Sequence, residues 1–210
     1  MVSLELLDDV ETGTNLLFTG PPMTGKYQLL LEFLGRSSDA AIVVTTKNGV
    51  ETVRSDLDAI RHYDDDRVGV VDCVTQQRDI ASGGAAETET TKFVSSPGNL
   101  TRIGVEFTDL FERFNERGLR TRVGVHSASQ LVMYSNLKQV YQFLQVLTGK
   151  LQSAGWTGGV VLDSTAHDDQ TIYTLQELFD GIVETRESAE GRREMRVRGL
   201  SAEASPWQPF

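Results

Sequence analysis

The residues best suited to chemistry in this chain are the eight from Gly20 to Tyr27. They follow the apolar run 15–19, which predicts a buried strand, and they precede 28–34, which predicts a helix. A glycine-rich turn between strand and helix that ends in lysine is typical of a phosphate-binding loop. Its glycines let backbone N–H groups face an anion, and the helix N-terminus and the lysine add positive charge. The predicted phosphate-binding residues are Gly20, Pro21, Pro22, Met23, Thr24, Gly25, Lys26 and Tyr27.

Tyr27 departs from this pattern, because the residue after the lysine is normally Ser or Thr. That hydroxyl binds the magnesium ion that accompanies the phosphates. The flanking strand and helix favour phosphate binding over a plain glycine-rich turn. The loop leaves magnesium-dependent chemistry open.

The elements around this loop alternate between short apolar runs and longer amphipathic stretches, which indicates a parallel α/β sheet flanked by helices. The predicted strands are 15–19, 40–45, 68–72, 122–126 and 159–163, and the predicted helices are centred on 28–34, 50–60, 103–114, 137–151 and 172–179. Asn99 is a predicted N-cap, and a hairpin of 181–185 and 193–199 closes the chain. Ligands of such sheets gather at the carboxyl ends of the strands, where the loop at Gly20 also lies.

The chain, residues 1–210, is expected to form a single domain, because its length suits one large core and is short for two. Residues 74–92 contain few large apolar side chains, and we expect a long mobile loop there. Cys73 is the single cysteine, so no intrachain disulfide can form, and the valine-rich run before it suggests a core position.

The charge balance is strongly acidic, with 20 Lys and Arg against 30 Asp and Glu and a net charge of -10. This charge disfavours non-specific contacts with nucleic acid. The only lysines are Lys26, Lys47, Lys92, Lys138 and Lys150, and such an acidic, lysine-poor composition predicts a salt-rich cytoplasm that screens repulsion. We see neither a signal peptide nor an apolar run long enough to span a bilayer, so we expect a cytoplasmic protein without membrane contact.

Several motifs, taken in order, resemble those of the RecA/KaiC-like P-loop ATPases, and especially of their small haloarchaeal branch, sometimes labelled HTR-like. They are Gly20–Lys26, Ser95–Thr101, Leu131–Tyr134, Leu178–Gly181 and Arg196–Gly199. Only the first is sharply specific alone, but their order and spacing extend over most of the chain. The resemblance implies a RecA-like α/β fold with a mostly parallel central sheet, ATP as the nucleotide, and a tendency to assemble.

The same resemblance identifies degenerate catalytic positions. KaiC-like ATPases have paired glutamates after the second strand to activate water, where this chain has Thr46 and Lys47. Their Walker B aspartate ends a later strand, where this chain has His126. Together with Tyr27, these replacements remove the magnesium hydroxyl, the magnesium-side carboxylate and the general base, so we expect slow or absent hydrolysis.

Asp163 is the one candidate catalytic residue that remains. Residues 160–163 match a Walker B pattern by themselves. The resemblance places their strand between the Walker B strand and the P-loop strand, which puts Asp163 at the sensor position near the γ-phosphate. It could hold a magnesium ion there through water, or it could instead cap the turn into Ser164 and Thr165.

Arg196 and Arg198 share one face of the last predicted strand. KaiC-like proteins have a basic K-x-R-G finger here that reaches the neighbouring subunit's nucleotide, and Arg196–Gly199 fits it with Arg in place of Lys. We expect the strand itself to lie away from the P-loop of its own subunit. The alternative is an edge strand guarded by charge. The tail Trp207–Phe210 is expected to dock on the core or on a partner, since exposed aromatics are disfavoured.

Two other constellations receive little weight. His167, Asp168 and Asp169 are too ordinary a set to specify a metal, and we interpret them as solvated residues before a helix. A Ser-His-Asp triad would lack the G-x-S-x-G elbow.

The sequence therefore favours an ATP-binding regulatory protein, at most a weak ATPase, in which nucleotide acts as a conformational or assembly signal toward a homo-oligomer or a protein partner. The alternative is a pseudo-ATPase interaction module that binds no nucleotide. A recombination-accessory ATPase is a weaker alternative, because the negative charge and the missing catalytic groups disfavour it.

Overall fold

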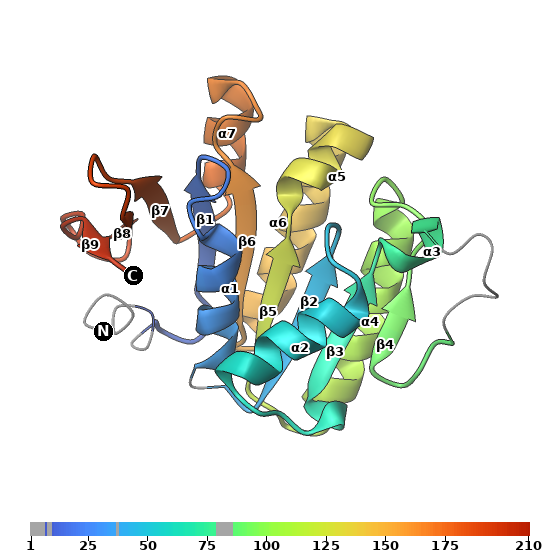
Figure 1. Ribbon diagram of the computed structural model, residues 1–210. Coiled ribbons are helices and arrows are strands. Elements are labelled where there is room, and N and C mark those ends of the chain that lie inside the picture. Colours follow the sequence, from blue (N-terminus) through green and yellow to red (C-terminus); the bar gives the residue numbers. More distant parts are fainter. Residues whose placement is uncertain (1–6, 8–9, 37, 79–85) are drawn as a thin grey trace.

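A nine-stranded sheet forms the centre of the part of the chain that the computed structural model describes, which is residues 7, 10–36, 38–78 and 86–210 (Figure 1). The strand order is β4-β3-β2-β5-β6-β1-β7-β8-β9. Neighbours from β4 to β7 pair in parallel, whereas β8 and β9 are antiparallel. The strands are β1 Asn15–Gly20, β2 Ala40–Thr45, β3 Val68–Asp72, β4 Thr91–Phe93, β5 Thr121–His126, β6 Thr157–Asp163, β7 Gly181–Glu187, β8 Arg193–Arg198 and β9 Gln208–Pro209.

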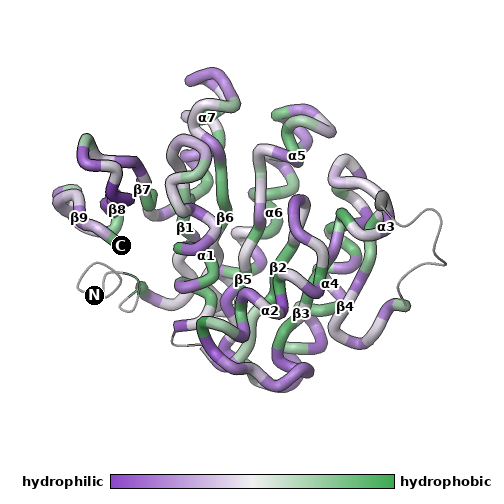
Figure 2. Tube along the Cα trace, in the orientation of Figure 1, coloured by the Kyte–Doolittle hydropathy of each residue, from purple (hydrophilic) through white to green (hydrophobic). Residues whose placement is uncertain are grey.

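Helices cover both faces of this sheet, α1 and α2 on one side and α4 and α6 on the other (Figure 1). The helices are α1 Lys26–Gly35, α2 Val50–Ile60, α3 Thr75–Arg78, α4 Leu100–Glu116, α5 Ala128–Tyr134, α6 Leu137–Ser153 and α7 Asp169–Gln176. Within β1, Leu16 and Phe18 belong to the core under α1, and Leu17 belongs to the core under α4 and α6. The central strands are therefore buried on both faces, which explains their continuous apolar runs (Figure 2).

The predicted architecture is confirmed: a mostly parallel sheet, flanked by helices and closed by an antiparallel hairpin. The strand ending at Asp163 lies between β5 and β1, as the resemblance implied. Asn99 caps α4 by accepting a hydrogen bond from the backbone N–H of Arg102 at 3.1 Å.

The expected loop at 74–92 is wrong at both ends. α3 occupies Thr75–Arg78, and β4 begins at Thr91 and pairs with β3. Residues 79–85, the middle of that predicted loop, lie outside the described part of the chain. α5 was also not predicted. These elements are short, so they show too little hydrophobic periodicity to be recognised from sequence.

Within the described ranges, no helix combines the length and the apolar character that crossing a membrane requires.

Candidate phosphate-binding site

The loop between β1 and α1 turns through two residues with left-handed backbone conformations. Met23 and Gly25 adopt left-handed conformations, with φ of 65° and 87°. Gly25 is the N-cap of α1, and among the described residues no side chain caps this helix. The first-turn N–H groups of α1 are therefore available to an anion, and the helix dipole adds partial positive charge at the same point.

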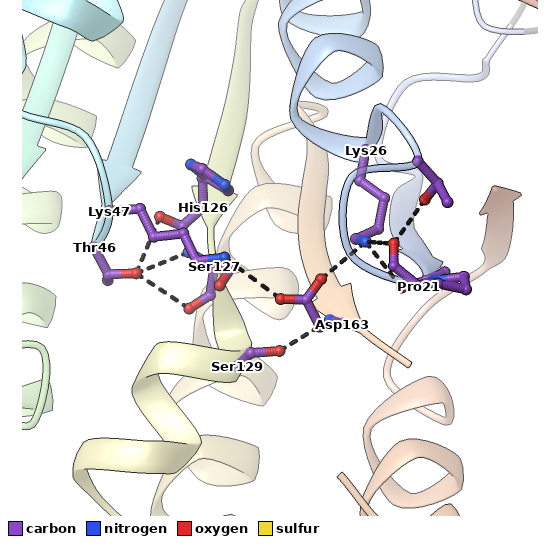
Figure 3. Close-up of polar contacts among 10 residues, drawn as sticks. Pro21, Lys26, Thr46, Lys47, His126, Ser127, Ser129 and Asp163 are labelled. Atoms are coloured by element: carbon purple, nitrogen blue, oxygen red, sulfur yellow. Dashed lines mark hydrogen bonds and ion pairs between the residues drawn. The ribbon is translucent and has the colours of Figure 1, made fainter. Parts of the chain in front are cut away.

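Lys26 folds back under this loop. Its ammonium Nζ donates to the carbonyl oxygens of Gly20 at 2.8 Å and Pro21 at 2.5 Å, and pairs with Asp163 Oδ1 at 2.8 Å (Figure 3). The pair forms because β1 and β6 are neighbours whose register sets Gly20 opposite Asp163. The side chain of Lys26 is only 5% exposed, and this burial lowers the pKa of its ammonium against the opposing effect of Asp163.

Asp163 holds two lysines at once. Its second oxygen, Oδ2, lies 3.4 Å from Nζ of Lys47, and its backbone N–H donates to Ser129 Oγ (Figure 3). Burial would raise the pKa of Asp163, but the hydrogen bond and charge of Lys26 and the charge of Lys47 lower it below its usual value. Among the described residues, its carboxylate bonds to these lysines and not to the turn at 164–165.

Tyr27 and His126 stack on each other, with ring centroids 4.3 Å apart and planes 23° apart. The Tyr27 hydroxyl donates to Asp56 Oδ2 on α2 at 2.9 Å, and burial raises its pKa, so it stays protonated. Burial also lowers the pKa of His126 to about 4, and the charge of Lys47 adds to this effect. His126 is therefore neutral at pH 7. Thr46 ties β2 to β5, because its Oγ1 accepts from the backbone N–H of Ser127 at 2.9 Å.

The buried, neutral His126 makes stability depend on pH. The unfolded chain binds a proton there near pH 6.5, whereas the folded chain does so only near pH 4. We therefore expect the free energy of unfolding to fall as pH drops through this window, by as much as about 3 kcal/mol from this group. Denaturant titrations of wild type and His126→Phe, which keeps a ring beside Tyr27, measure it. Identical pH profiles for the two proteins would contradict the assignment. The contribution of Asp163 is lost at lower pH, because its folded pKa lies below the usual 3.8.

A cavity of about 390 Å³ lies beside the loop and the first turn of α1. Its lining residues are Pro22, Met23, Gly25, Lys26, Tyr27, Gln28, Lys47, His126, Val161, Asp163 and Arg193. Most predicted site residues thus meet in one place, namely five of the eight loop residues, the replacement positions Lys47 and His126, and Asp163. Gly20, Pro21, Thr24 and Thr46 are not in its lining. Of the residues that the structure describes, three cations and one carboxylate line the cavity, in a chain whose net charge is -10. Two of the five lysines in the chain are here.

Arg193 lines this cavity and was not among the predicted site residues. The expectation that the last hairpin strand lies away from its own P-loop is wrong at this end of β8. β7 pairs directly with β1, and β8 runs back antiparallel beside β7, so β8 begins at the carboxyl edge of the sheet, near the loop. The position of Arg193 depends on the long-range pairing of β7 with β1, which the sequence pattern alone did not reveal.

Arg196 and Arg198 lie on one face, as predicted, and both pair with Glu184 on β7; the distance is 3.2 Å for Arg198. Arg196 also lines a second cavity, of about 220 Å³, together with Gly20 and Pro21. Neither arginine lines the larger cavity. Within this chain, the carboxylate of Glu184 therefore balances the charges of both arginines.

The tail docks on its own chain. The guanidinium groups of Arg186 and Arg196 lie over the ring of Trp207, at 4.1 and 4.6 Å from its centroid, and β9 pairs with β8. The ring of Phe210 reaches the loop, because a Cβ added to Gly25 would lie 2.9 Å from it. A larger residue at Gly25 would collide with this ring and would also be strained at a φ of 87°.

The remaining candidates have structural roles. Asp168 caps α7 by accepting from the N–H of Thr171 at 2.7 Å. Over the described residues, no group of three or more His, Cys, Asp or Glu could hold a metal ion. Cys73 is buried in the core, as expected.

A model described as a family of unknown function (DUF7504) matches residues 13–185, which is most of the chain. The chain belongs to the DUF7504 family. The matched part of DUF7504 runs from the loop before β1 into β7, and includes Lys26, Lys47, His126 and Asp163. No curated protein matches the chain.

Solved structures show which fold this DUF7504 protein has. It is similar to a KaiC-like protein from the hyperthermophilic archaeon Pyrococcus horikoshii OT3, with a TM-score of 0.65 and 14% identity, covering 95% of this chain and 85% of that chain. It is also similar to an uncharacterized protein from Pyrococcus horikoshii in complex with an unknown peptide, with a TM-score of 0.68 and 12% identity, covering 98% of this chain and 97% of that chain. The expected RecA-like fold of KaiC-like proteins is thereby confirmed for the DUF7504 chain.

Proposed function

We propose that this protein binds ATP at the Gly20–Tyr27 loop and uses the bound nucleotide as a conformational or assembly signal. The observation that supports this most is that Lys26 and the uncapped N-terminus of α1 lie at the same cavity. A lysine ammonium and free helix N–H groups together match the oxygens of a polyphosphate. The RecA-like fold and its similarity to a KaiC-like protein support ATP as the nucleotide.

Hydrolysis is proposed to be slow or absent, because the groups that would promote it are occupied or replaced. The Tyr27 hydroxyl bonds to Asp56, His126 is neutral, and Lys47 stands in place of a general base. Among the described residues, Asp163 is the one carboxylate that lines the cavity, and both of its oxygens bind lysines. It could assist catalysis only after releasing at least one of them.

A pseudo-ATPase that binds no nucleotide is the second candidate. The observation in its favour is that Lys26 already has three oxygen partners, while Phe210 covers Gly25. Such a protein would act through partners, and one similar structure contains an unknown peptide. A recombination-accessory role is a weaker proposal, because a net charge of -10 opposes nucleic-acid binding.

Calorimetric titration with ATP separates the two main candidates. The buffer should contain high potassium, since the acidic, lysine-poor composition supports a haloarchaeal cytoplasm as the setting. Saturable binding at one site supports the regulatory function. Absence of heat, with the protein shown to be folded, supports the interaction module instead.

We further propose that Arg198, with Arg196, serves the nucleotide of a neighbouring subunit by exchanging Glu184 for phosphate. ATP should then increase the mass of the wild-type particle in light scattering, because the assembled state binds nucleotide better. Arg198→Ala should lose this increase. Arg192→Ala, which removes an exposed arginine from the adjoining turn, is the matched control and should keep it. If wild type stays monomeric with ATP at high concentration, these arginines only guard the surface.

A further inference from the structure

The fold family implies a magnesium ion beside the nucleotide, but the residues at this site do not suit one. Magnesium requires hard oxygen ligands in octahedral geometry. The hydroxyl of Tyr27 is bound by Asp56, and its ring is held against His126. His126 offers a neutral nitrogen where a carboxylate would be needed. The donor set thus lacks both protein oxygens that would normally position the ion.

The carboxylate that remains among the described lining residues is neutralised. Asp163 Oδ1 pairs with Lys26 at 2.8 Å and Oδ2 with Lys47 at 3.4 Å, and its side chain is only 14% exposed. Lys47 follows β2 and reaches Asp163 on β6 across the end of β5, where His126 lies. A carboxylate at 126 would attract Lys47, whereas the neutral imidazole leaves the cavity with a surplus of two positive charges. This surplus is suited to an anion that brings no cation of its own.

The end of β5 also contains unsatisfied polar atoms. Among the described residues, His126 Nδ1 and Ser127 Oγ are buried without a hydrogen-bond partner. Their residues are 6% and 0% exposed, and His126 lines the cavity. Buried polar atoms are normally paired, because leaving them unpaired costs free energy. Because both atoms are inaccessible in this structure and only His126 of the two lines the cavity, an oxygen-rich ligand there could pair with His126 Nδ1 once the imidazole ring turns.

We propose that this site binds the triphosphate as the metal-free anion, with the Lys47 ammonium taking the place of the magnesium ion. Lys47 is 39% exposed, so it can exchange Asp163 for phosphate oxygens without unfolding its surroundings. Lys26 contacts the phosphates from the loop side by giving up a loop carbonyl, and its ammonium, which has three donors, keeps Asp163 as a partner once Lys47 has left. This inference rests on the proposed binding of ATP.

The experiment is a calorimetric titration of the full chain with ATP, once with EDTA and once with excess magnesium chloride. Wild type should bind in EDTA at least as tightly as in magnesium. Lys47→Ala should lose about tenfold or more in EDTA, since it removes a charge-assisted contact. Lys47→Arg should retain binding in EDTA. Lys138→Ala, which removes an exposed lysine on α6 outside the cavity, should bind like wild type.

The possible results distinguish failure of this inference from failure of the proposed function. Wild-type binding that requires magnesium overturns this inference and leaves the proposed function intact. Unchanged affinity of Lys47→Ala in EDTA overturns the role of Lys47. No binding by wild type in either solution overturns the proposed function, and the inference with it. Thermal melting of each variant distinguishes a loss of affinity from a loss of the folded structure.

Discussion

Lys26→Ala is expected to weaken ATP binding by at least about tenfold while the protein stays folded. Lys26 supplies the loop's charge-assisted contact with the phosphates, and such a bond is worth about 1.5–3 kcal/mol. The fold should survive, because Asp163 keeps Lys47 as a partner and is not left as an unpaired buried charge. Calorimetry gives the affinity, and a thermal melt gives the stability.

Lys92→Ala is the matched control for this variant. Lys92 is also largely buried, at 15% exposed, and pairs with Asp109 at 2.7 Å, but it lies on β4, an edge strand separated from β1 by four others. Its removal should leave ATP affinity unchanged. Equal affinities of wild type and Lys26→Ala would show that the loop does not bind the phosphates, and would favour the pseudo-ATPase.

Phosphate release by wild type is expected to be far slower than the ordinary ATPase range of about one per second or faster. Phosphoryl transfer needs a placed cation and an oriented water. The Tyr27 hydroxyl is directed to Asp56, Lys47 stands where the general base is expected, and the Asp163 carboxylate beside it is paired with two lysines. A phosphate-release assay with magnesium present, at saturating ATP, measures the rate.

Tyr27→Phe is the control for the expected slow phosphate release. It keeps the ring that stacks on His126 and removes only the hydroxyl. The slow rate should not change, because that hydroxyl is not expected to serve a metal. An ordinary ATPase rate in wild type would instead show that Asp163 or a partner supplies what the site lacks, and Asp163→Asn should then abolish the activity.

The amino-acid sequence by itself determined the main layers of the fold and the location of the loop. The runs 15–19, 40–45, 68–72, 122–126 and 159–163 are apolar because both faces of these strands are covered, so each strand can be recognised locally. The turn from Gly20 to Lys26 is likewise local, since the positive φ at Gly25 favours glycine. The resemblance to KaiC-like proteins added the position of the strand that ends at Asp163, which lies between β5 and β1.

Only the tertiary structure decided which side chains meet. The pairing of Lys26 with Asp163 depends on the register of β1 against β6, and the stack of Tyr27 on His126 depends on how α1 packs over the end of β5. Arg193 comes to the cavity, and Phe210 to Gly25, because β7 pairs with β1 and brings the last hairpin back to the loop. Such contacts join residues far apart in the chain. They follow from strand order and register, which the local pattern of apolar residues does not specify.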